Sequence, residues 1–331
     1  MTQVLELDPA HPQQDVIQRA ASTIREGGLV AFPTETVYGL GADAMSDTAV
    51  QKIFEAKGRP SDNPCIVHIA NRRMLDKVST GINQKTELLI KEFWPGPLTV
   101  VLLRNSAVTA SVSAGLSTIA VRMPNNKIAL ELISAAGLPI AAPSANASGK
   151  PSPTTAAHVL EDLNGRVDLI LDGGETKIGI ESTVVDMTTD PPVILRPGWI
   201  TQESMKSVIG DVENLASEDS LRRSPGTRHR HYSPRARVIL IGPEQDQMLK
   251  QVCVEHLNNG AVGFIGHSRL SIKNDNFYPI YLDANAEQYA HSIYRALREV
   301  DAKNPEVIVV EGISDDGVGV GVMDRLRRAA S

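Results

Sequence analysis

Residues 29–57 read LVAFPTETVYGLGADAMSDTAVQKIFEAK, and this stretch indicates the fold class of the chain. Its first four residues form an uninterrupted apolar run that Pro33 ends, which is typical of a buried strand. A turn bounded by glycines follows, and Asp47 can then cap a helix that continues to about Lys57. A buried strand, a turn and a helix in this order predict an α/β sheet domain.

The same alternation of strands and helices continues on both sides of this stretch. A helix is expected upstream at residues 15–26. Further strands are expected at 65–69, 98–103, 118–123, 140–142, 169–171 and 183–187, and helices at 85–93, 127–136 and 155–163. After an arginine-rich segment the alternation restarts, with strands at 238–241, 261–265, 279–282 and 307–310 and helices at 244–258, 287–301 and 323–330. We therefore expect an α/β domain at 1–210, a linker at 211–236 and a smaller α/β domain at 237–331 that resembles a nucleotide-binding sheet in outline.

Composition narrows the classes of function. Among 331 residues, 33 Lys and Arg stand against 39 Asp and Glu, a net charge of −6, so any RNA contact must come from a local patch such as residues 222–237. Cys65 and Cys253 are too few and too far apart for a disulfide scaffold or a Cys-based zinc site. No basic segment followed by an apolar one opens the chain, and no apolar run approaches roughly 18 residues. We expect a cytoplasmic protein without a membrane helix.

Two segments have the chemistry of phosphate binding. Lys57 and Arg59 lie at the end of a predicted helix, where they suit phosphate oxygens, although basic residues there also simply complement the helix dipole. Residues 141–153, AAPSANASGKPSP, form a loop of small hydroxyl and amide residues between a strand and a helix. Backbone N–H groups in such a loop can cradle phosphate, and a plain Ser/Pro loop is the alternative. No GxxxxGK[ST], GxSxG or HExxH motif is present.

Three further side chains lie where predicted strands end. Arg122 follows an apolar strand and therefore needs an anionic partner, which is either the carboxylate of a substrate or an internal Asp or Glu. His68 ends another apolar strand and is either a satisfied core histidine or a functional one. Thr34 lies in the turn after the strand at residues 29–32, where binding loops gather, although turn chemistry alone also explains it. From the residues alone the chain is an α/β enzyme that handles phosphate.

Taken together, these segments resemble the Sua5/YrdC family of threonylcarbamoyl-AMP synthases, in its longer two-domain Sua5 form. The resemblance spans essentially the whole chain. It rests on Lys57-x-Arg59, on Ser144-x-Asn146 and on the blocks FPTETVYGLGADA, FWPGPLTVVL, AVRMPNN, PIAAPSANASGKPSP, GIESTVVDM and ILRPGWIT in family order. Residues 224–234, SPGTRHRHYSP, match the family's interdomain linker. The resemblance implies a YrdC-like twisted mixed sheet with flanking helices and a smaller C-terminal Rossmann-like α/β domain.

The resemblance also implies an activity: condensation of L-threonine, bicarbonate and ATP into threonylcarbamoyl-adenylate, for N6-threonylcarbamoyladenosine in tRNA. The residues implied to hold threonine are Thr34, His68, Arg122, Ala142 and Ser182. The residues implied to surround ATP are Lys57, Arg59, Asn63, Thr118, Ser144, Asn146, Ser152, Arg196 and Tyr232. Mg²⁺ is expected to arrive with ATP, with no protein ligands assigned to it. A separate machinery is expected to carry the threonylcarbamoyl group to tRNA.

Two other functions compete with this one. An RNA-binding module would use the basic linker, but the acidic composition and the absence of an RNA-binding motif oppose it. A carbamoyl-adenylate-forming maturation factor shares this type of domain, but such proteins resemble larger chains with zinc-finger cysteines. Within the synthase interpretation, Tyr232 and its basic neighbours are expected to act as a lid over the active site. Removal of Lys57 or Arg59 is expected to reduce the rate with little loss of fold.

Overall fold

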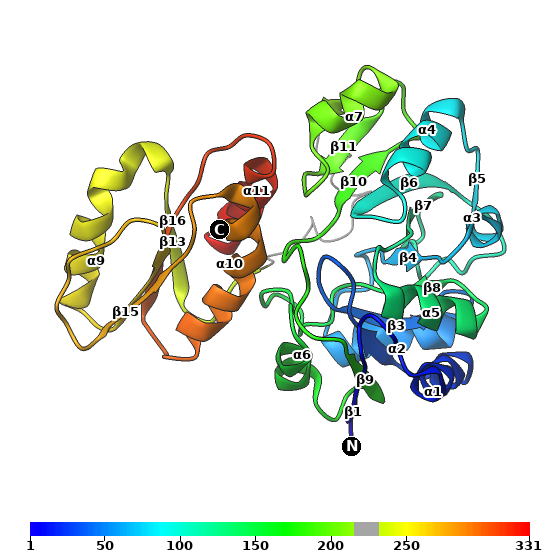
Figure 1. The fold of residues 1–331 in the computed structure, drawn as a ribbon, viewed down its shortest axis with the longest axis horizontal. Helices are drawn as coiled ribbons and strands as arrows, with labels where there is room; N and C mark the ends of the chain where they lie inside the picture. The colour runs from blue at the N-terminus through cyan, green and yellow to red at the C-terminus, as the bar shows by residue number, and fades with distance from the viewer. Residues whose placement is uncertain (215–231) are drawn as a thin grey trace. The chain divides into compact units, whose positions relative to one another are not determined.

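The computed structural model describes residues 1–214 and 232–331, and these divide into two compact units. The first comprises Met1–Ser148, Pro153–Lys177 and residues 181–214, and the second comprises Gly149–Ser152, Ile178–Ile180 and residues 232–331 (Figure 1). The second unit therefore includes two short segments from the first two hundred residues. Most of the predicted linker, with most of its basic cluster, lies outside the described residues.

The first unit is an α/β structure built on one large mixed sheet. Its strands are β1 (Gln3–Glu6), β2 (Val30–Phe32), β3 (Gly39–Asp43), β4 (Ile66–His68), β5 (Ser79–Thr80), β6 (Leu98–Arg104), β7 (Thr118–Arg122), β8 (Ile140–Ala141), β9 (Leu169–Asp172), β10 (Thr183–Asp186), β11 (Val193–Arg196) and β12 (Glu213–Asn214). Their order in the sheet is β1-β9-β2-β3-β8-β4-β7-β6-β10-β11-β12, with β5 paired to β6. Its helices are α1 (Gln14–Arg25), α2 (Asp47–Lys57), α3 (Arg72–Val78), α4 (Gln84–Phe93), α5 (Lys127–Ala136), α6 (Ala156–Leu163) and α7 (Gln202–Ile209).

Helix α2 shows how the local sequence fixes the position of a site residue. Its N-cap is Ser46, whose side chain accepts a hydrogen bond from the backbone N–H of Ala49. The expected cap, Asp47, is instead the first helical residue, where its charge favours the positive end of the helix dipole. The helix ends at Gly58, which has a left-handed φ of 61° that a residue with a Cβ adopts less readily. Lys57 is therefore held at the last helical position.

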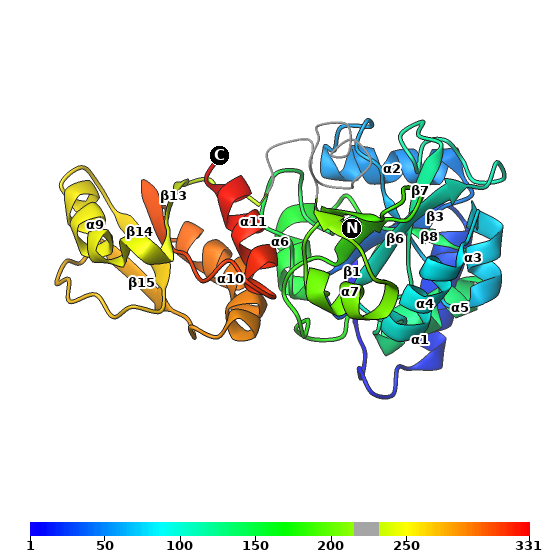
Figure 2. The same cartoon turned by 90° about the horizontal axis from the view of Figure 1, so that it is seen from above.

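The second unit is a smaller sheet with helices on both faces. Its strands are β13 (Arg237–Ile241), β14 (Val262–Gly266), β15 (Phe277–Tyr281) and β16 (Val307–Glu311), and all of their pairings are parallel. The strand order is β13-β16-β14-β15. The helical segments are η1 (Pro243–Met248), α9 (Leu249–Leu257), α10 (Ala286–Asp301) and α11 (Gly319–Ala329). Helix α9 covers one face, and α10 and α11 cover the other (Figures 1 and 2). The expected smaller α/β fold is confirmed, and the structure shows that its sheet is parallel.

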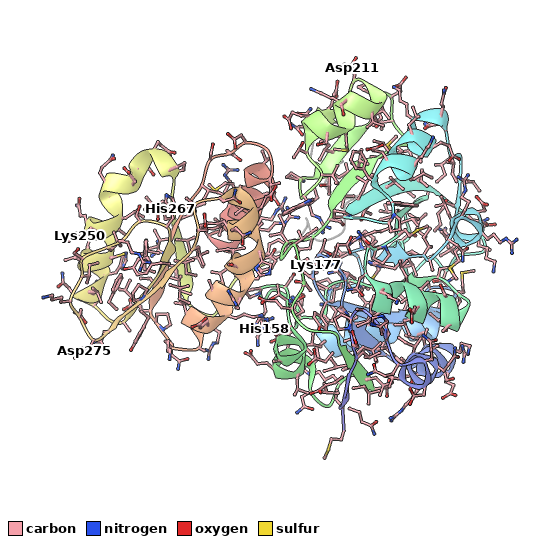
Figure 3. The ribbon with its side chains drawn as sticks, in the orientation of Figure 1. His158, Lys177, Asp211, Lys250, His267 and Asp275 are labelled. Atoms are coloured by element: carbon pink, nitrogen blue, oxygen red, sulfur yellow. The ribbon has the colours of Figure 1, made fainter. Side chains whose placement is uncertain are left out.

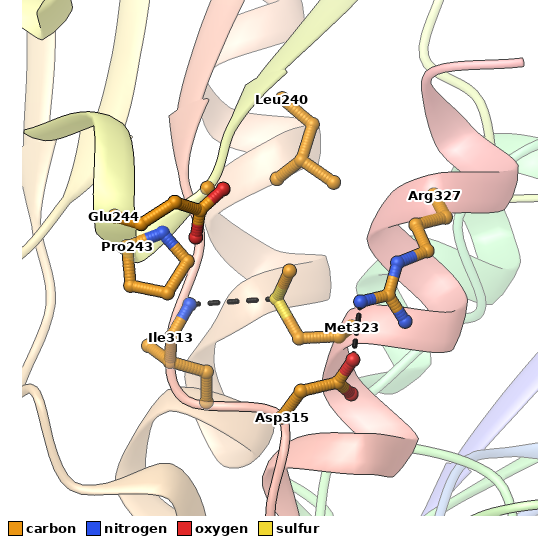
Figure 4. Close-up of a pocket in the computed structure, with 8 residues that line it drawn as sticks. Leu240, Pro243, Glu244, Ile313, Asp315, Met323 and Arg327 are labelled. Carbon is orange, nitrogen blue, oxygen red and sulfur yellow. Dashed lines mark hydrogen bonds and ion pairs between the residues drawn. The ribbon is translucent and has the colours of Figure 1, made fainter.

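The carboxyl ends of the strands in the second unit carry a buried acid and a pocket. Glu311, at the end of β16, accepts hydrogen bonds from the backbone N–H groups of His267 and Ser268 and from the Ser268 hydroxyl, which fixes the turn after β14. Figure 3 labels His267 in the second unit. A pocket of about 250 Å³ lies beside the ends of β13 and β16 (Figure 4). The residues that line it are Leu240, Gly242, Pro243, Glu244, Ile313, Asp315, Met323 and Arg327.

Several elements differ from the sequence predictions for identifiable reasons. Strand β3 was expected to be a turn because it contains two glycines, but a Cβ on Gly41 would lie 2.7 Å from a Phe32 ring carbon, so glycine permits close strand packing here. Helix α11 begins at Gly319, four residues before its expected start, because a glycine-rich segment is a weak helix signal. The helix expected at residues 244–258 is a 3-10 segment followed by α9. Strands β1, β5, β11 and β12 and helix α3 were not expected.

No helix among the described residues combines the length and apolar character needed to cross a membrane.

The hydrophobic core of the first unit is contributed by both the sheet and its helices, including Ile17 of α1, Ile53 of α2 and Leu132 of α5. The second unit has a separate core that includes Phe264 and Val309. Each sheet is thus held by its own buried apolar layer.

Candidate active site

The strand register of the first unit places predicted site residues side by side. His68 on β4 pairs with Arg122 on β7, and Arg122 pairs with Thr99 on β6. Across β6, Thr99 aligns with Val184 on β10, and Val184 aligns with Arg196 on β11. Residues that pair directly across strands project to the same face of a sheet. One row across the sheet therefore carries three residues that the sequence assigned to the site, although they lie far apart in the chain.

Arg122 is the centre of this row and is almost fully buried. Its Nη1 donates a hydrogen bond to the Thr36 hydroxyl at 2.9 Å, and its Nε donates to the Gly96 carbonyl at 3.2 Å. Its Nη2 lies 2.6 Å from Glu35 Oε1, and both side chains are buried. Of the two partners that the sequence left open, the structure shows the internal one, because a buried guanidinium requires a counter-charge.

The ion pair between Glu35 and Arg122 leaves hydrogen-bonding capacity unused. The two groups touch, but not in hydrogen-bonding geometry, so Glu35 Oε1, Glu35 Oε2 and Arg122 Nη2 have no hydrogen-bond partner. His68 Nδ1 is also buried without a partner. Buried polar atoms are nearly always hydrogen-bonded in native proteins, so this group of unsatisfied atoms marks a place where a ligand can complete the bonding.

His68 is held in its neutral form. Burial of the ring, and after it the nearby charge of Arg122, lower the pKa of His68 from 6.5 to about 3, against a smaller opposing effect of the Ile66 backbone. The ring also packs edge-on against Phe32, with 6.1 Å between the ring centroids. A neutral imidazole beside an arginine can exchange a hydrogen bond with a hydroxyl group without adding a second positive charge.

Thr34 belongs to a turn that connects with Arg122. Its hydroxyl lies 2.8 Å from the Thr36 hydroxyl and donates to the Val37 carbonyl at 2.7 Å. Since the Thr36 hydroxyl also accepts from Arg122, a continuous chain of hydrogen bonds joins Thr34 to Arg122. The structure therefore brings together Thr34, His68 and Arg122, three of the residues that the resemblance implies for threonine binding. Thr34 therefore stabilises its own turn and also lies beside the site.

Ser182 and Arg196 form a second part of the same face. The Ser182 hydroxyl lies 2.8 Å from the Thr99 hydroxyl. Arg196 donates to the Ser182 carbonyl from Nε at 3.2 Å and from Nη2 at 3.0 Å, and Nη2 also reaches the Ser182 hydroxyl at 3.3 Å. A residue implied to hold threonine is thus bonded to one implied to surround ATP, so the two predicted groups meet here.

Lys57 joins the two predicted phosphate segments. Its Nζ donates to the Ser144 carbonyl at 2.5 Å and to the Asn146 carbonyl, and it lies 3.5 Å from Asn146 Oδ1. The Ser144 hydroxyl in turn donates to Asn146 Oδ1 at 2.5 Å. Only 3% of Lys57 is exposed, so this residue does more than complement the dipole of its own helix. The loop at 144–146 is ordered around a buried cation.

The other predicted residues of the first unit are described by their own contacts and positions in the strands. Arg59 donates from Nε to the Asn63 carbonyl at 3.3 Å and from Nη2 to the Pro64 carbonyl at 3.0 Å. The Ala142 N–H donates to the Ile66 carbonyl at 2.8 Å, two residues before His68. Thr118 begins β7, four residues before Arg122, which corresponds to about 13 Å along an extended strand.

Ser152 and Tyr232 belong to the second unit. Ser152 is fully buried there, in the segment Gly149–Ser152. Tyr232 is 5% exposed, and its ring stacks on Tyr294 with 5.6 Å between centroids, while the guanidinium of Arg325 lies 5.9 Å from its centroid. Most of the basic neighbours that were expected to form a lid with Tyr232 lie outside the described residues.

Sequence reasoning missed three side chains that contact predicted site residues: Glu35, Thr36 and Thr99. Glu35 and Thr36 were not predicted because they lie in a turn, where polar residues are common and do not by themselves indicate burial. Thr99 also escaped notice, although a threonine inside the apolar strand LTVVLLR is a usable signal because its hydroxyl must find a buried partner. In the part of the chain that the structure describes, no group of three His, Cys, Asp or Glu side chains could hold a metal ion.

Comparisons with known proteins agree with this geometry. A family model described as "Telomere recombination" matches residues 22–198, and one described as "Threonylcarbamoyl-AMP synthase, C-terminal domain" matches residues 200–331. Threonylcarbamoyl-AMP synthases of Pyrococcus abyssi and Bacillus subtilis are 47% and 45% identical to the chain, over 95% and 98% of it and over 94% and 95% of their own lengths.

A solved structure supports the same assignment. The crystal structure of P. abyssi Sua5 complexed with L-threonine matches with a TM-score of 0.93 and 45% identity, covering 100% of this chain and 97% of that one. These matches do not favour the alternative of an RNA-binding module. With both family models matched and relatives of this identity over nearly the whole chain, the protein belongs to the Sua5 family of threonylcarbamoyl-AMP synthases, in its two-domain form.

Proposed function

We propose that this chain condenses L-threonine, bicarbonate and ATP into threonylcarbamoyl-adenylate and releases pyrophosphate. Besides family membership, one observation carries the proposal: Lys57 bonds directly to the loop at 144–146, although Lys57 and Ser144 lie 87 positions apart in the sequence. The two motifs with phosphate chemistry therefore form one structure. The product is proposed as the donor for N6-threonylcarbamoyladenosine in tRNA, with a separate machinery making the transfer.

The group around Arg122 is proposed to bind threonine. Arg122 would hold the carboxylate, since a guanidinium offers paired donors that match two oxygens. His68, neutral and with a buried Nδ1 that lacks a partner, would bond the β-hydroxyl. Thr34, Ser182 and the backbone near Ala142 would complete the pocket. Support for this assignment is the row of side chains across β4, β7 and β6 and the unsatisfied polar atoms within it.

The residues around Lys57 are proposed to surround ATP. Lys57 and Arg59 would face the phosphates, with Asn63, Thr118, Ser144, Asn146, Ser152, Arg196 and Tyr232 as further contacts. In this proposal Mg²⁺ enters bound to the phosphates of ATP and belongs to the substrate. Lys57 donates its N–H groups to the carbonyls of the loop at 144–146. Its contribution to ATP binding would therefore include holding the loop in place as well as supplying charge.

The proposed reaction needs no strong general base for its adenylation step. Once the threonine amine has taken up CO2, a carbamate oxygen forms a bond to the α-phosphorus, and the bond from that phosphorus to the oxygen of pyrophosphate breaks. The attacking oxygen is already anionic, so catalysis rests on position and on charge neutralisation. This agrees with a site whose buried titratable groups include two arginines, a lysine, a glutamate and a neutral histidine.

Pyrophosphate release tests the proposal directly. The full chain is incubated with ATP and Mg²⁺, and threonine and bicarbonate are each omitted in turn. The expected result is release that requires both, together with a threonine-dependent adenylate seen by mass spectrometry. Release without either would identify a plain ATP pyrophosphatase, and no release under any condition would remove the synthase assignment.

A further inference from the structure

Glu35 is a buried acid that no sequence motif singled out for a role. It lies in the turn after β2, with 5% of its surface exposed, and its Oε1 is 2.6 Å from Arg122 Nη2. Neither of its carboxylate oxygens makes a hydrogen bond. A buried carboxylate normally accepts several hydrogen bonds, because burial removes the water that would otherwise supply them. The ion pair with Arg122 supplies a counter-charge to Glu35 but leaves its acceptors unsatisfied.

The contacts of Arg122 leave donors available beside Glu35. A guanidinium has five N–H donors. One bond from Nε goes to Gly96, and one from Nη1 goes to Thr36. Nη2 makes no hydrogen bond. Unused donors of Arg122 and unused acceptors of Glu35 are therefore neighbours within one buried site.

Such a pair complements an α-amino acid. The zwitterion carries an ammonium and a carboxylate on the same carbon, so a positive and a negative side chain in contact can face the two groups at once. Opposite charges that match across a contact favour the correct ligand and disfavour one that lacks either charge. Arg122 alone would recognise any carboxylate, so recognition of an amino acid requires a second, negative group.

We propose that Glu35 is a threonine-binding residue whose carboxylate accepts the α-ammonium group while Arg122 holds the α-carboxylate. This assignment rests on the proposed synthase function and adds to it the group that selects amino acids over other small carboxylic acids. Without threonine, Glu35 remains against Arg122 and supplies its counter-charge.

A purely structural role for Glu35 makes a different prediction. If Glu35 only holds Arg122 in place, its replacement weakens every carboxylate ligand equally. If Glu35 binds the ammonium, its replacement weakens threonine but not the analogue in which a hydroxyl replaces the α-amino group, 2,3-dihydroxybutyrate. That analogue presents no positive charge to Glu35, so removal of the negative charge leaves its affinity unchanged or increases it.

The experiment is calorimetric titration of the full chain, without ATP, with L-threonine and with 2,3-dihydroxybutyrate. The proteins are the wild type, Glu35→Gln and the control Glu87→Gln, which loses an exposed partner of Arg72. For Glu35→Gln we expect threonine to bind about 10- to 100-fold more weakly, since a hydrogen bond between charged groups is lost, with the analogue bound equally well or more tightly. The control leaves both affinities unchanged.

Three results would overturn the assignment in distinguishable ways. Equal losses for threonine and the analogue in Glu35→Gln would show that Glu35 only supports Arg122, and unchanged threonine affinity would show no contact at all. Absence of threonine binding to the wild type would remove the proposed function itself. If Glu35→Gln does not fold, as judged by its thermal unfolding, Glu35→Asp keeps the charge but shortens the reach, and the same selective loss for threonine is expected.

Discussion

Replacing Lys57 by methionine is expected to reduce both the stability of the first unit and the rate of the reaction. Methionine keeps most of the volume of the side chain but removes the charge that bonds the Ser144 and Asn146 carbonyls. A hydrogen bond to a charged group contributes about 1.5–3 kcal/mol, and removal of a buried charge offsets part of the loss of two such bonds. We expect the free energy of unfolding to decrease by about 2–4 kcal/mol. The structure therefore changes the sequence-based expectation that the loss of Lys57 would leave the fold largely intact.

Thermal unfolding followed by circular dichroism measures the first effect. In a unit of this size, 1 kcal/mol shifts Tm by about 2–4 °C, so the expected decrease is roughly 5–15 °C. Arg59→Met is the matched control, because Arg59 is only partly buried and bonds its two carbonyls at 3.3 and 3.0 Å, so its Tm should decrease less. Pyrophosphate release at 25 °C, where both variants are folded, should fall at least about 100-fold for Lys57→Met.

Two outcomes would refute this reasoning. A Tm within about 1 °C of the wild type, well short of the decrease derived from two lost hydrogen bonds, would show that Lys57 does not hold the loop. A normal rate of pyrophosphate release in Lys57→Met would show that Lys57 has no part in ATP chemistry. The two measurements are separate, so a stable but inactive variant would retain the catalytic role and reject the structural one.

The remaining predictions concern the group around Arg122. The pKa of His68 is lowered to about 3 in the folded state, so the unfolded chain takes up the proton first as pH falls. The contribution of neutral His68 to the free energy of unfolding is therefore complete above about pH 6.5 and is lost as pH falls towards 3, by up to about 5 kcal/mol. In His68→Gln this pH dependence of the free energy of unfolding should be absent when urea unfolding is measured from about pH 6.5 down to about pH 3. Thr99→Val should destabilise the fold by about 1 kcal/mol and raise the KM for threonine, because the Ser182 hydroxyl loses its shorter hydrogen bond and keeps only the 3.3 Å contact with Arg196 Nη2 among its described bonds. Serine, which lacks the methyl group, should react with a kcat/KM about 10–200-fold below that of threonine, measured by pyrophosphate release; equal values would exclude a pocket for the methyl.

The fold class was predictable because the central strands are short apolar runs between clear turns. Strands β4, β6, β7 and β10 were all expected within one or two residues. Strand β11 was not, because its four residues lie between prolines that favour a loop in a sequence read alone. The pairing of strands was also beyond the sequence, since register depends on which distant strands meet. The alignment of His68 with Arg122 and Thr99 is therefore a result of the structure.

The site was predictable as a set of motifs but not as a network. Lys57 and the loop at 144–146 were recognised separately, and only the structure shows that they bond to each other. For Arg122 the sequence required an anionic partner but could not choose between a ligand and an internal acid. A glutamate in a turn resembles ordinary surface chemistry, so nothing local marked Glu35 as buried. Burial and partner identity are tertiary properties, which is why these parts were missed.

The division of the chain into units has a consequence for its ancestry. Pro151 belongs to the second unit, where its carbonyl accepts a hydrogen bond from Arg298, and Gly179 lies so close to the backbone of Ala290 and His291 that no side chain would fit. These short segments interrupt the part of the chain that builds the large sheet. In an ancestor consisting of the large sheet alone, neither the Arg298 donor nor the α10 backbone would have been present to constrain these two segments. Relatives that lack the second unit are therefore expected to tolerate larger side chains at the position of Gly179.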